Sequence, residues 1–188
     1  MRTFTAIELP AEIKISLAKI QEKLKTSLPK ISWVKPENLH LSLKFIGEVS
    51  AEQADNFKQL ITGAAETAAP FELKIDSLGV FPDTSGARII WAGTDAPAPP
   101  LLQLVEELEK RFAKSGIPRE HRPYRAHITL GRIKQSIDRH TLEEILDRLK
   151  PEITGMQLKF KAAGITLFES VLGSGSPVYS SLKKADFK

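Results

Sequence analysis

The chain has 188 residues, of which 41% are hydrophobic and 27% charged; these are values of a globular protein and exclude a disordered or collagen-like chain. It contains no cysteine, which excludes disulfides, thiol nucleophiles, iron–sulfur clusters and cysteine-ligated zinc. No apolar run approaches the roughly 18 residues of a membrane helix, and the N-terminal residues carry charges and a proline where a signal peptide needs an apolar stretch. We therefore expect a cytoplasmic protein with one domain, or two small lobes that share a core.

Positive charge is concentrated in one window of the chain. The formal net charge is +4, but residues 110–134 contain eight basic residues and one acidic residue, so the window carries 8 − 1 = +7 and the remainder 4 − 7 = −3. A concentrated positive patch attracts polyanions such as RNA. A solvated basic face explains a charge cluster equally well, so the window alone does not decide between the two.

Strands and helices alternate in the first half of the chain. In chain order the patterns predict a strand at 2–8, a helix at 10–27 and a strand at 39–46. A helix then begins at Ser50 with a capping box to Gln53, and a strand or strand pair follows at 71–81.

The second half repeats this order at a nearly constant offset. The patterns predict a strand at 88–92, a helix at 101–115 and a strand at 127–133. A helix capped by Asp138 follows, then further strands at 157–168 and an extra segment near 177–183. The offset between His40 and His127 is 127 − 40 = 87, and the other element starts agree with it to within a few residues. We therefore expect one domain, 1–188, built from two β-α-β-α-β pseudo-repeats, about 1–94 and 95–188.

The chemistry lies on the strand that the two halves share. Residues 40–43 (HLSL) and 127–130 (HITL) repeat the pattern histidine, aliphatic, hydroxyl, leucine. Because side chains alternate along a strand, each histidine shares a face with its hydroxyl, Ser42 or Thr129. If the halves pack about a pseudo-twofold axis, two imidazoles and two hydroxyls converge on one cleft. Such a pair suits acid–base catalysis near neutral pH, with the hydroxyls donating to phosphoryl oxygens.

A zinc site is the main alternative for these histidines. It would use His40, His127 and His121 with a carboxylate. Neither motif copy has a second histidine or a carboxylate at ligand spacing, and the chain has neither a P-loop nor a dinucleotide-binding loop. We therefore expect a reaction without metal, ATP or dinucleotide cofactor.

At this level of detail the chain resembles the two-histidine (2H) phosphoesterase superfamily, and within it the bacterial and archaeal RNA 2′,3′-cyclic phosphodiesterases, also called 2′-5′ RNA ligases. The similar text spans the chain: RTFTAIELP at the start, WVKPENLHLSLKFIGEV at 33–49, FPDTSGARIIWAG at 81–93, RPYRAHITLGR at 122–132 and LFESVLGSGSPVY at 167–179. Two positions depart from the family pattern. Ser42 stands where threonine is usual, and Ala126 where a proline commonly precedes the second histidine.

The resemblance implies a bilobal α+β fold, in which each lobe is an antiparallel sheet with outer helices and the active site lies in the groove between them. It implies hydrolysis of a terminal RNA 2′,3′-cyclic phosphate to a 2′-phosphomonoester, and ATP-independent 2′-5′ joining of tRNA halves. By position in the motifs, His40 would protonate the leaving oxygen and His127 would accept the proton of the nucleophile. We expect the protein to act as a monomer.

Several further residues have less specific patterns. Arg125 lies two residues before His127 and would share its face, whereas Arg132 lies five residues after it and would point to the opposite face of a regular strand. Both are candidates for phosphate binding. Three aromatic residues could stack on a base but are more simply core residues, namely Phe4, Trp33 and Tyr124.

Two other functions fit parts of the sequence. A non-catalytic RNA-binding module would share the basic window but has no need for two matched histidine strands. A related esterase could act on small cyclic nucleotides or ADP-ribose cyclic phosphate. The length of the chain and the PENLHL context favour the RNA enzyme.

Overall fold

The elements follow one another largely as the sequence predicts. The computed structural model describes residues 1–28, 30–171 and 177–188, so that part of the 167–179 text quoted above lies outside the described residues. In chain order the elements are β1 (Arg2–Glu8), α1 (Ala11–Ser27), β2 (Ile31–Trp33), the 3₁₀ turn η1 (Pro36–Asn38), β3 (His40–Glu48), α2 (Ala51–Ala65), β4 (Phe71–Ile75), β5 (Ser77–Phe81), β6 (Ile89–Gly93), α3 (Pro99–Lys114), β7 (His127–Ile133), α4 (Arg139–Gly155), β8 (Leu158–Ala162), β9 (Gly164–Val171) and β10 (Val178–Asp186).

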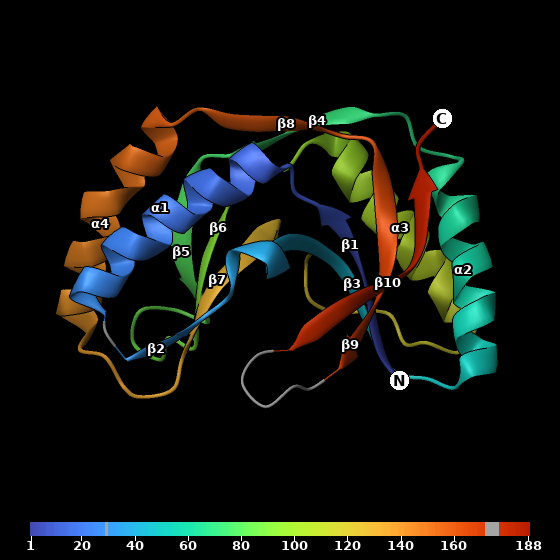
Figure 1. The fold of residues 1–188 in the computed structure, drawn as a ribbon, viewed down its shortest axis with the longest axis horizontal. Coiled ribbons are helices and arrows are strands. Elements are labelled where there is room, and N and C mark those ends of the chain that lie inside the picture. Colours follow the sequence, from blue (N-terminus) through green and yellow to red (C-terminus); the bar gives the residue numbers. More distant parts are fainter. Residues whose placement is uncertain (29, 172–176) are drawn as a thin grey trace.

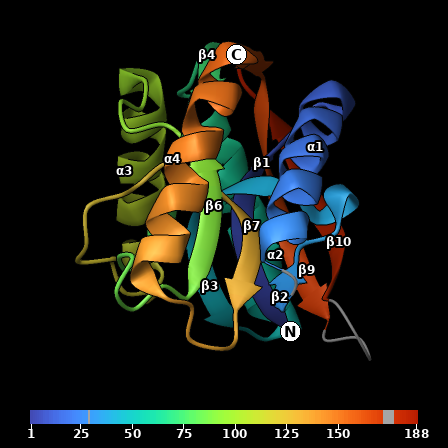
Figure 2. The same cartoon turned by 90° about the vertical axis from the view of Figure 1, so that its left-hand side faces the viewer.

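Two four-stranded antiparallel sheets form the centre of the molecule. The first sheet has the strand order β10-β9-β1-β3 and the second the order β2-β7-β6-β5. Helices α2 and α3 lie on the outer side of the first sheet, and α1 and α4 on the outer side of the second (Figures 1 and 2). The expected α+β architecture with outer helices is therefore confirmed.

Each sheet combines strands from both halves of the sequence. Strands β9 and β10 extend the sheet of β1 and β3, whereas β2 and β5 extend the sheet of β6 and β7. The segment 71–81 is indeed a strand pair, but its strands separate: β5 joins the second sheet, and β4 pairs with β8 in a two-stranded sheet at one end of the molecule (Figure 1). This exchange ties the sheets together, and β3 and β7 lie side by side between them.

The local signals for helix starts are confirmed. Ser50 accepts a hydrogen bond from the backbone of Gln53, whose side chain accepts one from the backbone of Ser50 in return. Asp138 accepts from the backbone of Thr141 at the start of α4. Each such cap contributes about 1 kcal/mol to stability. The sequence patterns gave no sign of the three-residue strand β2.

Glycine is required where an aromatic ring of the second sheet needs space. A Cβ on Gly79 of β5 would come within 2.4 Å of the indole of Trp91, which lies against that glycine. Trp91 in turn stacks on Phe81, with ring centroids 5.2 Å apart.

We expect Gly79→Ala to lower the free energy of unfolding by about 1–3 kcal/mol, since the buried indole must move. Urea unfolding measures the change. Gly155→Ala is the matched control: a Cβ there meets nothing within 4 Å, so stability should be unchanged or slightly higher. Equal stability of the two variants would contradict the packing described for Trp91.

Candidate active site

A β-bulge follows the hydroxyl residue in both histidine strands. In β3, Ser42 lies opposite Ala6 and Lys44 lies opposite Thr5, so Leu43 is the extra residue. In β7 the register skips Leu130 in the same way. Since 130 − 43 = 87, the bulge repeats at the offset that relates the two motifs.

The bulge changes which side chains lie on the same face of the strand as the histidine. In both strands the histidine, the hydroxyl residue and the residue five after the histidine are partly or fully exposed, and the residues between them are buried. Arg132 therefore lies on the same face as His127, and Phe45 lies on the same face as His40. A regular strand would have turned Arg132 to the opposite face, but that condition does not hold here, because the bulge shifts the alternation by one residue.

Both imidazoles are held by the same backbone contact. Nδ1 of His40 lies 2.7 Å from the carbonyl oxygen of Asn38, and Nδ1 of His127 lies 2.8 Å from that of Arg125. A carbonyl oxygen only accepts hydrogen bonds, so each Nδ1 carries the proton and donates it. Each Nε2 is thereby left as the working atom: a base when the ring is neutral and an acid when it is charged.

Aromatic rings surround His40. Its ring centroid lies 4.8 Å from that of Phe4 and 5.3 Å from that of Tyr179, whose ring meets it edge-on. Burial lowers the pKa of His40, and the positive charges of Lys14, His127 and Arg132 lower it further, against the bond to the Asn38 carbonyl, which raises it.

His127 has a simpler environment. The ring of Phe81 meets it edge-on at 4.9 Å, and the guanidinium of Arg125 lies over the Phe81 ring, 5.5 Å from its centre. Burial lowers the pKa of His127, the bond to the Arg125 carbonyl raises it, and the charge of Arg125 lowers it. Phe81 of β5 and Phe168 of β9 are also 87 residues apart. Each histidine strand therefore has a phenylalanine near it that comes from a strand exchanged between the sheets.

The two hydroxyl residues lie on the histidine face of their strands. Ser42 and Thr129 are both partly exposed there. Tyr124 donates its hydroxyl proton to the backbone oxygen of Ser42 at 2.9 Å, so this bond holds the backbone of Ser42 and does not use its side-chain hydroxyl. Strands β3 and β7 contact each other, and each carries its histidine and its hydroxyl residue on its partly exposed face.

The remaining aromatic candidates pack within the protein, and the two remaining histidines are exposed. Trp33 packs against Gly131 on the buried face of the second sheet, and Tyr124 is held through its hydroxyl, so neither offers a ring to a base. Phe4 is buried beside His40. His121 and His140 are exposed. Across residues 1–28, 30–171 and 177–188, no three histidine, aspartate or glutamate side chains gather as metal ligands would.

Four of the eight basic residues in the 110–134 window are paired with carboxylates. The partners are Lys110 and Arg119 with Glu106, Arg111 with Glu107, and Arg122 with Glu120. Two of those glutamates, Glu106 and Glu107, precede the window in the sequence, so the window together with its partners carries 7 − 2 = +5. Arg125 and Arg132, which have no such partner among the described residues, lie at or near the histidines.

Sequence patterns missed three residues of this face. Phe45 is 66% exposed and lies across from Phe4, with ring centroids 6.1 Å apart. Tyr179 and Phe81 border the two imidazoles. The offset of 87 could have found Phe45, as the counterpart of Arg132, but no local signal identifies the two residues that come from exchanged strands.

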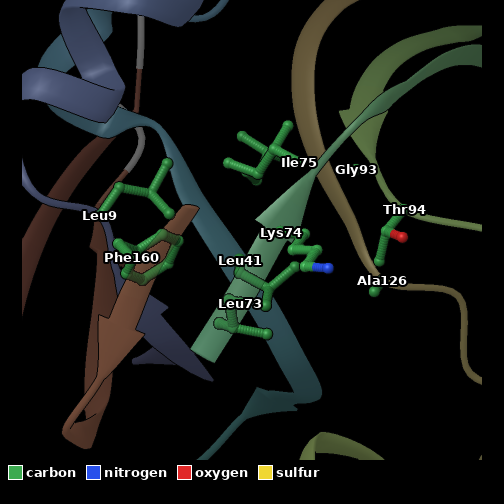
Figure 3. Close-up of a pocket in the computed structure, with 10 residues that line it drawn as sticks. Leu9, Leu41, Leu73, Lys74, Ile75, Gly93, Thr94, Ala126 and Phe160 are labelled. Carbon is green, nitrogen blue, oxygen red and sulfur yellow. The ribbon is translucent and has the colours of Figure 1, made fainter. Parts of the chain in front are cut away.

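A small cavity lies behind the histidine strands and is separate from this face. Its volume is about 10 Å³, space for no more than about one water molecule, and its lining includes Leu41, Ile128 and Ala126 (Figure 3). Leu41 and Ile128 point inward from the two histidine strands, so the cavity belongs to the packing between the sheets.

Comparison with known proteins agrees with the sequence motifs. The model of the family LigT like Phosphoesterase matches the chain twice, over residues 7–91 and 93–179. An RNA 2′,3′-cyclic phosphodiesterase from Methanocaldococcus jannaschii is 32% identical over 98% of this chain and 99% of its own length. One from Methanothermobacter thermautotrophicus is 30% identical over 97% of both chains.

Solved structures show the same relationship. The crystal structure of TT0787 from Thermus thermophilus has a TM-score of 0.82 at 28% identity, covering 100% of this chain and 98% of that one. E. coli LigT complexed with 3′-AMP has a TM-score of 0.76 at 29% identity, covering 99% and 97%. The duplicated histidine strands, the fold and the two family matches lead to one conclusion: the chain belongs to the LigT-like phosphoesterases, a family of two-histidine phosphoesterases.

Proposed function

We propose that this protein is an RNA 2′,3′-cyclic phosphodiesterase that hydrolyses a terminal cyclic phosphate to a 2′-phosphomonoester. The observation that carries the proposal is the pair of imidazoles whose Nδ1 protons are bound to carbonyls and whose Nε2 atoms have no hydrogen-bond partner among the described residues. The names of the full-length relatives supply the substrate class.

In the proposed reaction, water attacks the phosphorus and the bond to the 3′-oxygen breaks. Nε2 of His127 takes the proton of the water, and Nε2–H of His40 gives a proton to the 3′-oxygen as it leaves. Ser42, Thr129 and Arg132 donate to the non-bridging oxygens, where negative charge builds up in the transition state. Arg125 adds positive charge beside His127.

The difference between the two strands supports this order of roles. An exposed aromatic ring, Phe45, occupies the position on the His40 strand that Arg132 occupies on the His127 strand. Nucleobases stack on exposed rings. A base on Phe45 places its ribose, and hence the leaving 3′-oxygen, toward His40, and leaves the His127 side open to water.

The proposal extends to three finer points. A 5′-hydroxyl in place of water would give ATP-independent 2′-5′ joining, with tRNA halves as the substrates. We also propose a monomer, because one chain supplies both histidine strands, and a cytoplasmic location. None of the helices in the described residues could span a membrane.

The first test is hydrolysis of an RNA with a 2′,3′-cyclic phosphate end, in EDTA and without ATP, followed by identification of the oxygen that keeps the phosphate. We expect a 2′-phosphomonoester. His40→Ala or His127→Ala should each lower kcat by at least about 10³-fold, and the double variant should be hardly slower, because the pair acts as a unit. Near-normal kcat in either single variant would refute the mechanism, and activity that needs a divalent ion would favour the zinc alternative.

The pH dependence should reflect two lowered imidazole pKa values. One histidine must be charged and the other neutral, so the active form is most populated between the two pKa values of the pair. Both pKa values lie below the usual 6.5, so kcat/KM, which reports the free enzyme, should peak below pH 6.5. The bound phosphate raises both pKa values, so kcat should peak at higher pH. A kcat/KM optimum above pH 7 would contradict this.

A further inference from the structure

An exposed connection leads into the second histidine. Residues 115–126, here called the strap, run from the end of α3 beside the first sheet to the start of β7 in the second sheet. Residues 119–123 and 125 of the strap are exposed. The strap nevertheless carries the Arg125 carbonyl oxygen that holds Nδ1 of His127. Its position therefore determines the position and the tautomer of that imidazole.

A buried ion pair holds the first part of the strap. Nζ of Lys44 lies 2.7 Å from Oε2 of Glu109, and the two side chains are 3% and 9% exposed. Lys44 also donates to the carbonyl oxygen of Pro118 at 2.9 Å, and Glu109 accepts from the backbone of Glu120 at 3.2 Å. Lys44 and Glu109 thus each bind the backbone of the strap as well as each other.

Tyr124 holds the last part of the strap. Its hydroxyl donates to the carbonyl oxygen of Ser42 at 2.9 Å. Burial raises the pKa of Tyr124, so the hydroxyl remains a donor over the whole working range of pH. Both Ser42 and Lys44 lie within four residues of His40 on β3, so the strap takes its position from the strand of the other histidine.

These contacts are poorly explained by stability alone. A buried ion pair of this kind costs desolvation energy that its attraction often does not repay. Nor does the fold require it, since the bulge turns Gly131 inward at the position equivalent to Lys44 and the second sheet has no such pair there. These contacts instead hold the otherwise exposed strap beside both histidine strands.

We propose that Lys44, Glu109 and Tyr124 are positioning residues that set the location and tautomer of His127 relative to His40. They act through the strap and touch no substrate. The inference rests on the proposed function for its effect on rate, but its effect on the imidazole does not depend on any activity.

The segment before His40 is held separately. Lys14 donates to the carbonyl oxygen of Glu37 at 2.8 Å, and Asn38 donates through its side chain to the carbonyl oxygen of Pro177 at 2.9 Å. Loosening the strap should therefore affect His127 and leave His40 as it is. This selectivity distinguishes a positioning role from general destabilisation.

The test is ¹⁵N NMR of the histidine side chains in the full chain, at a pH where both rings are neutral. Tyr124→Phe removes one hydrogen bond and keeps the ring, and Lys44→Met with Glu109→Gln removes the ion pair without leaving a lone buried charge. Thr3→Val is the matched control, because Thr3 is buried and its hydroxyl donates to the carbonyl oxygen of Gly47 within the sheet, away from the strap and its anchors.

We expect Nδ1–H to dominate for both histidines in the wild type. In the strap variants the Nε2–H form of His127 should increase while His40 is unchanged, and kcat should fall by about tenfold with KM within about twofold of wild type. Thr3→Val should leave both rings and kcat unchanged.

An unchanged His127 in both strap variants would overturn the proposal. Equal changes in His40 and His127 that follow the melting temperature would overturn it too, since they indicate general loosening. A wild-type protein that does not hydrolyse cyclic phosphates would refute the proposed function, and the NMR result would still decide whether the strap positions His127.

Discussion

The site depends on one contact made twice: an imidazole Nδ1–H that donates to the carbonyl oxygen two residues earlier. A neutral imidazole has two tautomers, and only the one with a free Nε2 can take a proton from a nucleophile in the cleft. The carbonyl selects that tautomer without adding a charge beside the ring. A carboxylate in the same place would raise the pKa of the imidazole, whereas here burial and nearby cations keep both pKa values low. The backbone before each strand must therefore be held firmly, and much of the surrounding structure does this.

The repeated motif supplies the same reactive groups twice, and the differences between its two copies distinguish the roles of the two histidines. The histidine, the hydroxyl and the bulge recur at an offset of 87, as 127 − 40 and 130 − 43 both show. In both strands the bulge turns the next two positions in the same directions, but different residues occupy these positions. The inward position holds Lys44 in one strand and Gly131 in the other, and the outward position holds Phe45 and Arg132. We propose that a duplicated β-α-β-α-β unit, about 1–94 and 95–188, underlies this arrangement; the two separate matches to the family model support that view.

The sequence was sufficient for features whose signal is local. Hydrophobic spacing and capping residues predicted the helices, and the repeated motif predicted two histidine strands that share a face with Ser42 and Thr129. It failed where a partner strand decides the outcome. Arg132 could not be placed, because a bulge depends on the register with β6. Tyr179 and Phe81 could not be assigned, because they reach the histidines from strands exchanged between the sheets. The ion pairs of the basic window could not be assigned, because Glu106 and Glu107 reach it across helical turns and a connection and offset two of its seven net charges.

We propose that His40 and His127 present their Nε2 atoms to one shared anion. The decisive measurement is titration with adenosine 2′-monophosphate, followed by ¹⁵N NMR of the histidine side chains. We expect the Nε2 signals of His40 and His127 to shift together with one dissociation constant and both Nδ1 atoms to stay protonated. The exposed His121 and His140 should stay unchanged and serve as internal references. A shift of only one of the two site histidines, or two different dissociation constants, would contradict the account.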